Sequence, residues 1–252
     1  MFTRLLIGLD GSPSADEALE QAVMLGKRFN SKLVVAHVKE TNAAGRRASD
    51  SGDLLGRANE RVKDAGLRVE TILLRGDPDV ELAALAHGVD TVLVGRRGRT
   101  SAAQGASVVG KTVASLIRIA EGSVIVCASK PSPMERCAIA YDGRETAQRA
   151  LELVARFASV TQSTVHVIHA TIDSAIGTMV VGEAEAALSL QGIAFVTHLE
   201  HGTPAEAVAR VIRLTQCDAL FAGAHIGKRL AVTVSHAEEI LLHTDIPVVI
   251  QP

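Results

Sequence analysis

The sequence predicts an α/β protein made of two tandem copies of one open, mainly parallel sheet. Short apolar runs alternate with stretches whose apolar residues recur at helical spacing. Strands that alternate with helices need right-handed crossovers and a parallel sheet that is covered on both faces. The same order of elements begins again about halfway along the 252 residues. Offsets of 126 to 132 residues separate the repeated landmarks, which are Asp10 and Asp142, Gly76 and Gly202, and Asp90 and Asp218.

The first half starts with a continuous apolar run at residues 5–9, closed by an Asp-Gly-Ser-Pro turn. This is typical of a buried parallel strand. A helix is expected from Ala15 to Phe29, with Ser12 or Ser14 as its cap. The polar stretch 40–53 is expected to be a mobile loop. The other expected elements of this half are strands at 33–38, 68–74, 91–95 and 123–128 and helices at 54–65, 80–87 and 112–120.

The second half repeats this order after a linker that carries two prolines, Lys130–Arg136. We therefore expect two domains, residues 1–130 and 136–252. The last strand of each half is apolar and needs to be paired or covered, so we expect the halves to pack as a pseudo-dimer. The expected strands of the second half are 138–141, 165–169, 193–199, 218–223 and 246–250, and its expected helices are 147–157, 183–190 and one after Pro204.

Composition argues against several classes of function. The formal net charge of −2 offers no basic excess for nucleic acid or anionic membranes, and 2 % aromatic residues provide few platforms for stacking bases. The first apolar run is too short for a signal sequence or a membrane span. Cys127, Cys137 and Cys217 form no CxxC pair, which disfavours a disulfide framework or a zinc site. We expect a cytoplasmic protein without a membrane span.

A candidate phosphate site lies in the first half. Asp90 leads an apolar strand that ends in Gly95-Arg96-Arg97-Gly98, and Gly110-Lys111-Thr112 then opens a helix. Backbone N–H groups and the positive end of a helix dipole meet at such a junction, which suits a phosphate. Arg96, Arg97 and Arg99 are either counter-charges for phosphates or part of an exposed basic loop.

Residues Gly105–Thr112 also match the P-loop pattern GxxxxGK[ST]. A P-loop follows its strand directly, but here the preceding strand ends at Gly95, ten residues before the pattern starts. The apolar run at residues 5–10 that could imitate a Walker B strand lies before the motif and not after it. We therefore treat the match as a coincidence.

Taken together, the residues resemble the universal stress protein family in its tandem two-domain form. No single element is specific, but their order and their repetition are. The resemblance implies that each domain is a Rossmann-like sheet of the adenine nucleotide alpha hydrolase-like type, with five strands in the order 3-2-1-4-5 and helices on both faces. In the first half it rests on Asp10-Gly11-Ser12, Ala36-His37-Val38, Gly76-x-Pro78, Asp90-x4-Gly95-x2-Gly98 followed by Gly110, and Ser123–Val126.

The resemblance also implies a nucleotide site at the carboxyl ends of the strands, where a topological switch point places a ligand. Asp10 would meet the ribose or the adenine end, and the backbone of Val38 would meet adenine. The glycines would let the loop approach the phosphates, and the residues that open the last helix would supply N–H groups. The residues carried over as contacts are Asp10, Gly11, Val38, Val94, Gly95, Arg96, Gly98, Gly110, Lys111 and Thr112.

Both halves depart from the family pattern. Gly98 and Gly110 enclose eleven residues, where ATP-binding members usually have nine, and Lys111 stands where Ser or Thr is usual. In the second half only six residues separate Gly227 from Val234, whose β-branched side chain resists the positive φ that Gly110 permits. We therefore expect the second half to be a structural or regulatory copy. Its equivalent residues are Asp142, Ala170, which replaces Val38, Gly223, Gly227 and Ser235.

Other motifs carry little chemistry. His166 and His169, like His198 and His201, are three residues apart along expected strands and so point to opposite faces, which is poor metal-site geometry. The run His225–Lys228 is similar to the HIGH motif of adenylyl-transferring synthetases, but it follows the fourth strand of its domain and not the first. We expect no metal site.

These observations predict a stress-response regulatory protein whose first domain binds ATP or a related adenine nucleotide, with or without Mg2+, and with little or no turnover. Two alternatives remain open. One is a nucleotide-independent protein-interaction module of the same fold, and the other is a slow Mg-dependent ATPase, for which the sequence offers no dedicated carboxylate pair. We expect a homodimer of tandem chains that acts on other proteins.

Overall fold

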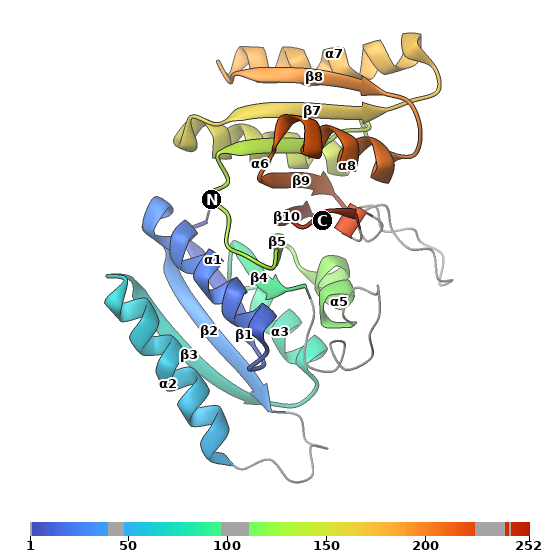
Figure 1. Ribbon diagram of the computed structural model, residues 1–252. Helices are drawn as coiled ribbons and strands as arrows, with labels where there is room; N and C mark the ends of the chain where they lie inside the picture. The colour runs from blue at the N-terminus through green and yellow to red at the C-terminus, as the bar shows by residue number, and fades with distance from the viewer. Residues whose placement is uncertain (1, 40–47, 97–110, 225–239, 242) are drawn as a thin grey trace. The chain divides into compact units, whose positions relative to one another are not determined.

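The computed structural model describes residues 2–39, 48–96, 111–224, 240–241 and 243–252. It divides into two compact units, Met1–Pro131 and Ser132–Pro252 (Figure 1). Each unit is an α/β sheet flanked by helices, which confirms the predicted fold class and its duplication.

The first unit contains parallel strands in the order β3-β2-β1-β4-β5, as the resemblance implied. Strand β1 is central, and the side chains of Leu5, Leu6 and Ile7 are fully buried in it. A strand that is buried on both faces has to be apolar throughout, which explains the unbroken run in the sequence. The strands are β1 (Arg4–Leu9), β2 (Lys32–Lys39), β3 (Arg68–Arg75), β4 (Thr91–Gly95) and β5 (Ser123–Cys127), and the helices are α1 (Pro13–Phe29), α2 (Ala48–Asp64), α3 (Pro78–Ala86) and α5 (Lys111–Ile119).

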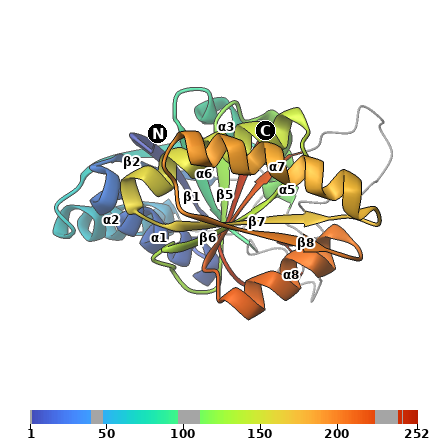
Figure 2. The same ribbon diagram turned by 90° about the horizontal axis from the view of Figure 1, so that it is seen from above.

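The second unit repeats the same topology in the order β8-β7-β6-β9-β10. Figure 2 shows α6 and α7 on one face of this sheet and α8 on the other. Its core is mainly aliphatic and includes a tilted ring pair, Phe157 and Phe221, with 5.5 Å between the ring centroids. The strands are β6 (Arg136–Ala140), β7 (Thr164–Ala170), β8 (Phe195–Glu200), β9 (Ala219–Gly223) and β10 (Val248–Gln251), and the helices are α6 (Glu145–Thr161), α7 (Ser174–Leu190) and α8 (Pro204–Thr215).

Two helices begin six or more residues earlier than the sequence predicts. Helix α2 starts at Ala48, so residues 48–53 are not the loop that their polar composition indicated. Polar residues suit an exposed first helical turn as well as a loop, and composition alone does not separate the two. Helix α7 starts at Ser174, nine residues before the predicted start at 183, because Asp173 caps it by accepting from the N–H groups of Ala175 and Ile176. Residues 40–47 lie outside the described part of the chain.

In each unit, an aspartate directly before one strand fixes the start of the neighbouring central strand. Asp90 before β4 does so for β1, and Asp218 before β9 does so for β6. In the first unit, Asp90 Oδ2 accepts hydrogen bonds from the backbone N–H groups of Thr3 (2.7 Å) and Arg4 (3.0 Å). In the second unit, Asp218 accepts from Glu135 (3.1 Å) and Arg136 (2.8 Å) in the same way. The repeated strand-leading aspartates are therefore structural and lie at the amino ends of the strands, at the opposite edge from the candidate ligand site.

Candidate functional site

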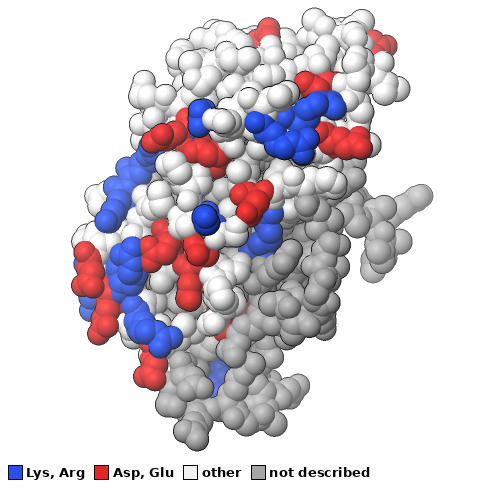
Figure 3. All heavy atoms as spheres, in the orientation of Figure 1, with Lys and Arg blue, Asp and Glu red and all other residues white. Residues whose placement is uncertain are grey.

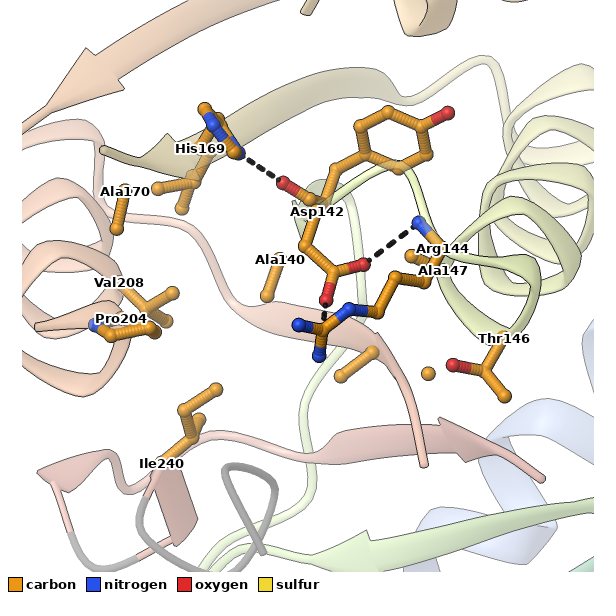
Figure 4. A pocket seen from close by; sticks show the side chains of 14 residues that line it. Ala140, Asp142, Arg144, Thr146, Ala147, His169, Ala170, Pro204, Val208 and Ile240 are labelled. Carbon is orange, nitrogen blue, oxygen red and sulfur yellow. Dashed lines mark hydrogen bonds and ion pairs between the residues drawn. The ribbon is translucent and has the colours of Figure 1, made fainter. Parts of the chain in front are cut away.

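A pocket of about 330 Å³ opens at the carboxyl ends of β6, β7 and β9 in the second unit (Figure 4). Ala140, Ala170 and Gly223 end these three strands, so the pocket lies at the edge of the sheet where a switch point places ligands. The residues that line it are Ala140, Tyr141, Asp142, Arg144, Thr146, Ala147, Ile168, His169, Ala170, Pro204, Val208, Ala222, Gly223 and Ile240.

The polar side of this pocket is a tight turn after β6. Gly143 adopts a φ of 77°, which few residues with a side chain tolerate. The turn brings the Asp142 carboxylate back to Arg144, whose backbone N–H donates to Asp142 Oδ1 at 3.0 Å. The Arg144 guanidinium reaches the other carboxylate oxygen at 3.5 Å, as Figure 4 shows. A carboxylate and a guanidinium therefore stand together at one edge of the pocket.

His169, at the end of β7, holds this turn in place. Its Nδ1 lies 2.8 Å from the backbone oxygen of Tyr141, and the ring is buried. Because a carbonyl only accepts, Nδ1 carries the proton and donates. Tyr141 itself has a raised pKa, chiefly because of its burial and also because of the nearby charges of Glu183 and Asp142.

The other sides of the pocket are apolar. Ile168, Val208 and Ile240 are almost fully buried, and the alanines that end the strands keep the space between them open. An apolar slot with a few charged groups at one edge is the usual form of a small-molecule site.

The first unit repeats the polar turn at the end of β1. Asp10 Oδ1 accepts from the backbone N–H of Ser12 at 2.9 Å, and Gly11 has a φ of 76°. His37 Nδ1 lies 2.7 Å from the backbone oxygen of Leu9, as His169 does from Tyr141. The predicted residues Asp10 and Gly11 therefore occupy a strand-end turn with the same hydrogen bonds in both units.

Val38 and Ala170 occupy matching positions beyond the end of the central strand. Strand β1 pairs with β2 as far as Leu9, opposite His37, and β2 continues past it through Val38. One side of the backbone of Val38 thus lies past the end of β1, as the predicted contact with a base requires. In the second unit, β7 extends in the same way from Ile168 to Ala170.

Gly95 and Gly223 have a packing role that the sequence did not reveal. A Cβ on Gly95 would lie 2.5 Å from the backbone of Ser14 in α1, and one on Gly223 would lie 2.4 Å from the backbone carbon of Thr146 in α6. The first turn of each helix therefore packs directly on the strand end. Val94 is buried just before Gly95, and Arg96 follows the strand and is half-buried.

Thr112 makes a contact that the sequence did not predict. It lies in the first turn of α5, which begins at Lys111, and its hydroxyl donates to the Asp79 carboxylate in α3 at 2.8 Å. Asp79 is buried, and its place in the first turn of α3, directly after Pro78, was the available signal. The side chain of Thr112 thus ties α5 to α3. The other predicted residues, Gly98, Gly110, Gly227 and Ser235, lie outside the described residues.

The histidines that are three residues apart do not form joint sites. His166 Nδ1 instead lies 3.0 Å from Nε2 of His198 on the neighbouring strand, and the ring centroids are 5.2 Å apart. The pKa values of both rings are lowered, chiefly by burial, so this pair is mainly neutral at pH 7. In the part of the chain that the structure describes, no three His, Cys, Asp or Glu side chains form a group that could hold a metal ion. None of the described helices has the length and hydropathy to span a bilayer.

Comparison with known proteins finds the same duplication that the structure shows. The model of the universal stress protein family matches residues 1–128 and again residues 134–252. The chain belongs to the universal stress protein family. Universal stress protein YxiE of Bacillus subtilis is 29 % identical over a match that covers 39 % of this chain and 81 % of that protein.

Two solved structures share the whole tandem fold of this universal stress protein. One, from Archaeoglobus fulgidus, has a TM-score of 0.85 at 20 % identity and covers 100 % of this chain and 98 % of its own. The other, assigned to the same family and from Pseudomonas aeruginosa, has a TM-score of 0.72 at 15 % identity, with 99 % and 93 % covered. At these identities the likeness concerns the fold alone.

The two units of this universal stress protein differ at the start of the helix beside the site. Ser12 caps α1 with a side chain that accepts from the N–H of Ala15 at 3.2 Å. Arg144 takes the corresponding place before α6 and makes no capping hydrogen bond. The second unit thus has an arginine at the pocket edge where the first has a helix cap, a difference that aligning the two halves of the sequence would have revealed.

Replacing Arg144 by serine is expected to stabilise the second unit by roughly 0.5–1 kcal/mol. The serine would cap α6, whereas the lost ion pair with Asp142 is exposed and worth little. Differential scanning calorimetry would measure the shift of the unfolding transition. Ser12→Ala, which removes the existing cap of α1, should lower stability by about 1 kcal/mol and serves as the control. An Arg144→Ser variant that is less stable than the wild type would contradict this account of the cap.

Proposed function

We propose that this chain is a stress-response regulator that binds an adenine nucleotide, ATP in the first place, at the carboxyl edge of its first sheet. It holds the nucleotide with little or no turnover. The observation that carries this proposal is the duplicated strand-end arrangement, which in the second unit encloses a pocket of about 330 Å³. Pockets for small molecules typically measure about 300–1,000 Å³.

The described residues of the first unit fit this ligand. The Asp10 carboxylate offers an acceptor for ribose hydroxyls, and the backbone of Val38 past the end of β1 offers groups that can bond the edge of a base. Arg96, directly after β4, brings a cation to the side where phosphates would lie. A bound nucleotide would supply an aromatic base and an anionic chain, and these residues would only bind and orient it.

The first test is to denature the freshly purified protein and to identify any released nucleotide by mass. Isothermal titration of ATP into the wild type and into Gly110→Val follows, because valine blocks the close backbone approach that glycine allows at this position. Arg144→Ser is the matched control for the second unit and should leave the binding by the first unit unchanged. Absence of both released nucleotide and binding heat at several temperatures would refute the proposal and favour an interaction module.

A slow ATPase is the enzymatic alternative. It requires phosphate release that depends on Mg2+ and that is lost in Asp10→Ala. We expect no turnover above a protein-free control, and measurable Mg-dependent release would overturn this part of the proposal.

The pocket favours a second candidate function, ligand binding by the second unit as well. Ala170 leaves more room than Val38 does, and Arg144 adds a cation at the edge of the pocket. A titration that gives two ATP per chain in the wild type and one in Ala170→Phe would support this candidate. One ATP per chain in both would restrict binding to the first unit.

We further propose that the chain forms a homodimer and acts in the cytoplasm on protein partners. This proposal follows from the apolar composition of the final strand of each half, and because β5 and β10 are themselves buried, the dimer would use another surface of the chain. Sedimentation that shows only a monomer across a wide range of concentrations would refute the dimer.

A further inference from the structure

Helix α7 exposes an apolar stripe that the core does not use. Ile176, Met179 and Leu190 are 58 %, 74 % and 89 % exposed, and Ile172, just before the helix, is 95 % exposed. The spacing of Ile176, Met179 and Leu190 places these three residues on one side of the helix, together with the exposed Ala186 and Glu183. The opposite side is the one that packs on the sheet, through Gly177, Val181, Ala184 and Leu188. We call the side formed by Ile176, Met179, Ala186 and Leu190 the outer face of α7.

The first unit shows that the fold does not require this apolar face. Its corresponding helix, α2, also has 17 residues and lies 126 positions earlier in the chain, at 48–64 compared with 174–190. The exposed positions there are charged, because Asp53, Glu60 and Asp64 stand where Met179, Ala186 and Leu190 stand in α7. The fold therefore accepts charged residues at the exposed positions of this helix. The apolar surface of α7 is not needed for folding and requires another explanation.

The chain segment that contains α7 and β8 carries acidic residues and no lysine or arginine, and the exposed Arg144 lies in the turn on which α7 packs. No Lys or Arg occurs between Phe157 and Ala209, whereas Asp173 and Glu183 are exposed on or beside the outer face. In Figure 3 the surface over α2 and β3 in the first unit alternates between blue and red. An apolar stripe with acidic residues and no cations complements a partner with an apolar stripe and basic flanks.

We propose that the outer face of α7 is a docking surface for a basic amphipathic helix of a partner protein. Two copies of this face would bring Glu183 and its equivalent into one interface to which α7 itself contributes no cation, so a second copy fits less well. An anionic membrane attracts basic helices and repels this one. The 17 residues of α7 extend over about 26 Å, which matches a partner helix of roughly five turns.

The docking surface adjoins the pocket of the second unit. A Cβ on Gly143 would lie 3.4 Å from Val180 and 3.7 Å from the Glu183 carboxylate, so α7 packs on the turn that carries Asp142 and Arg144. The proposal does not depend on nucleotide binding, because it rests on the surface chemistry of α7 alone.

The test uses a fluorescent peptide of roughly 18 residues with leucines at helical spacing and lysines on the flanking positions, and a twin with glutamates in place of the lysines. Fluorescence anisotropy with the full chain measures binding. The lysine peptide should bind the wild type, more weakly at high salt, and the glutamate peptide should bind about tenfold more weakly or not at all.

The decisive variant combines Met179→Asp with Leu190→Asp. It introduces the aspartates that the first unit has at the equivalent positions of α2, so it should fold normally. It should weaken the binding of the lysine peptide about tenfold or more. Leu214→Asp is the matched control, because Leu214 on α8 is 76 % exposed and lies away from α7. Equal binding to all three proteins, or no binding to the wild type, would overturn the proposal. A wild-type dimer that dissociates in the double variant would also overturn it, since the occupant would then be a second copy.

Discussion

Replacing Gly223 by alanine is expected to destabilise the second unit by about 3 kcal/mol. The new methyl group would lie 2.4 Å from the backbone carbon of Thr146 and 2.6 Å from the backbone nitrogen of Ala147. A flexible side chain could move away from such a contact, but here the neighbour is the first turn of α6, which a buried helix face holds in place. Thermal unfolding should show the transition of this unit lowered by on the order of 10 °C.

Gly182→Ala provides the control for this prediction. Gly182 lies within α7, and a Cβ there would meet nothing within 4 Å. Alanine is the better helix former, so this variant should be more stable by up to about 1 kcal/mol. If Gly223→Ala unfolds at the temperature of the wild type, the start of α6 is free to shift and the close packing is not needed.

The inner strands were predictable from the sequence because they are largely buried on both faces and are therefore short apolar runs, as in β4 and β5. The edge strands β3 and β8 are only partly buried and mix charged with apolar residues, and the strand order followed from the family resemblance. Strand β4 at Thr91–Gly95 matches its prediction, and most other strand ends shift by a few residues. Helix α7 was predicted at half its length. The helix itself carries apolar residues on both its buried and its exposed side. The alternation of apolar and polar residues that reveals a helix is therefore weak in this segment.

The candidate site was only partly predictable. Asp10, Gly11 and their copies follow from a local pattern, a strand that ends in an Asp-Gly turn. The apolar side of the second pocket comes from Val208, Pro204 and Ile240, which are distant in sequence and carry no local signal. The pairing of His166 with His198 depends on the register of β7 and β8, which no pattern in one sequence specifies.

Gly95 and Gly223 show why a correct motif can have a second explanation. The family resemblance assigned Gly95 to phosphate approach and Gly223 to the equivalent position of the second half. In the structure their missing side chain is also required by the helix that packs on the strand end. A repeated glycine in a duplicated fold therefore indicates close backbone approach, and the structure decides which backbone approaches.

Asp90→Ala is expected to destabilise the first unit by about 2 kcal/mol at neutral pH. The carboxylate accepts two backbone hydrogen bonds, from Thr3 at 2.7 Å and Arg4 at 3.0 Å, and these fix the start of β1. Alanine would leave both N–H groups at the edge of the sheet with water as the alternative partner. Asp64→Ala, an exposed carboxylate at the end of α2, should change stability by less than about 0.5 kcal/mol and is the control.

The effect of Asp90 should also depend on pH. Burial acts to raise its pKa, but the hydrogen bonds from Thr3 and Arg4 outweigh burial, and the pKa of Asp90 lies below its ordinary value of 3.8. A carboxyl group with a lowered pKa contributes fully above its unfolded pKa, and the contribution is lost as the pH falls through the folded pKa. The difference in unfolding free energy between the wild type and Asp90→Ala should therefore be constant from about pH 7 to pH 5 and shrink below about pH 4. Denaturant unfolding at a series of pH values measures it, and a difference that persists undiminished well below pH 3 would show that the charge of Asp90 is not what holds the start of β1.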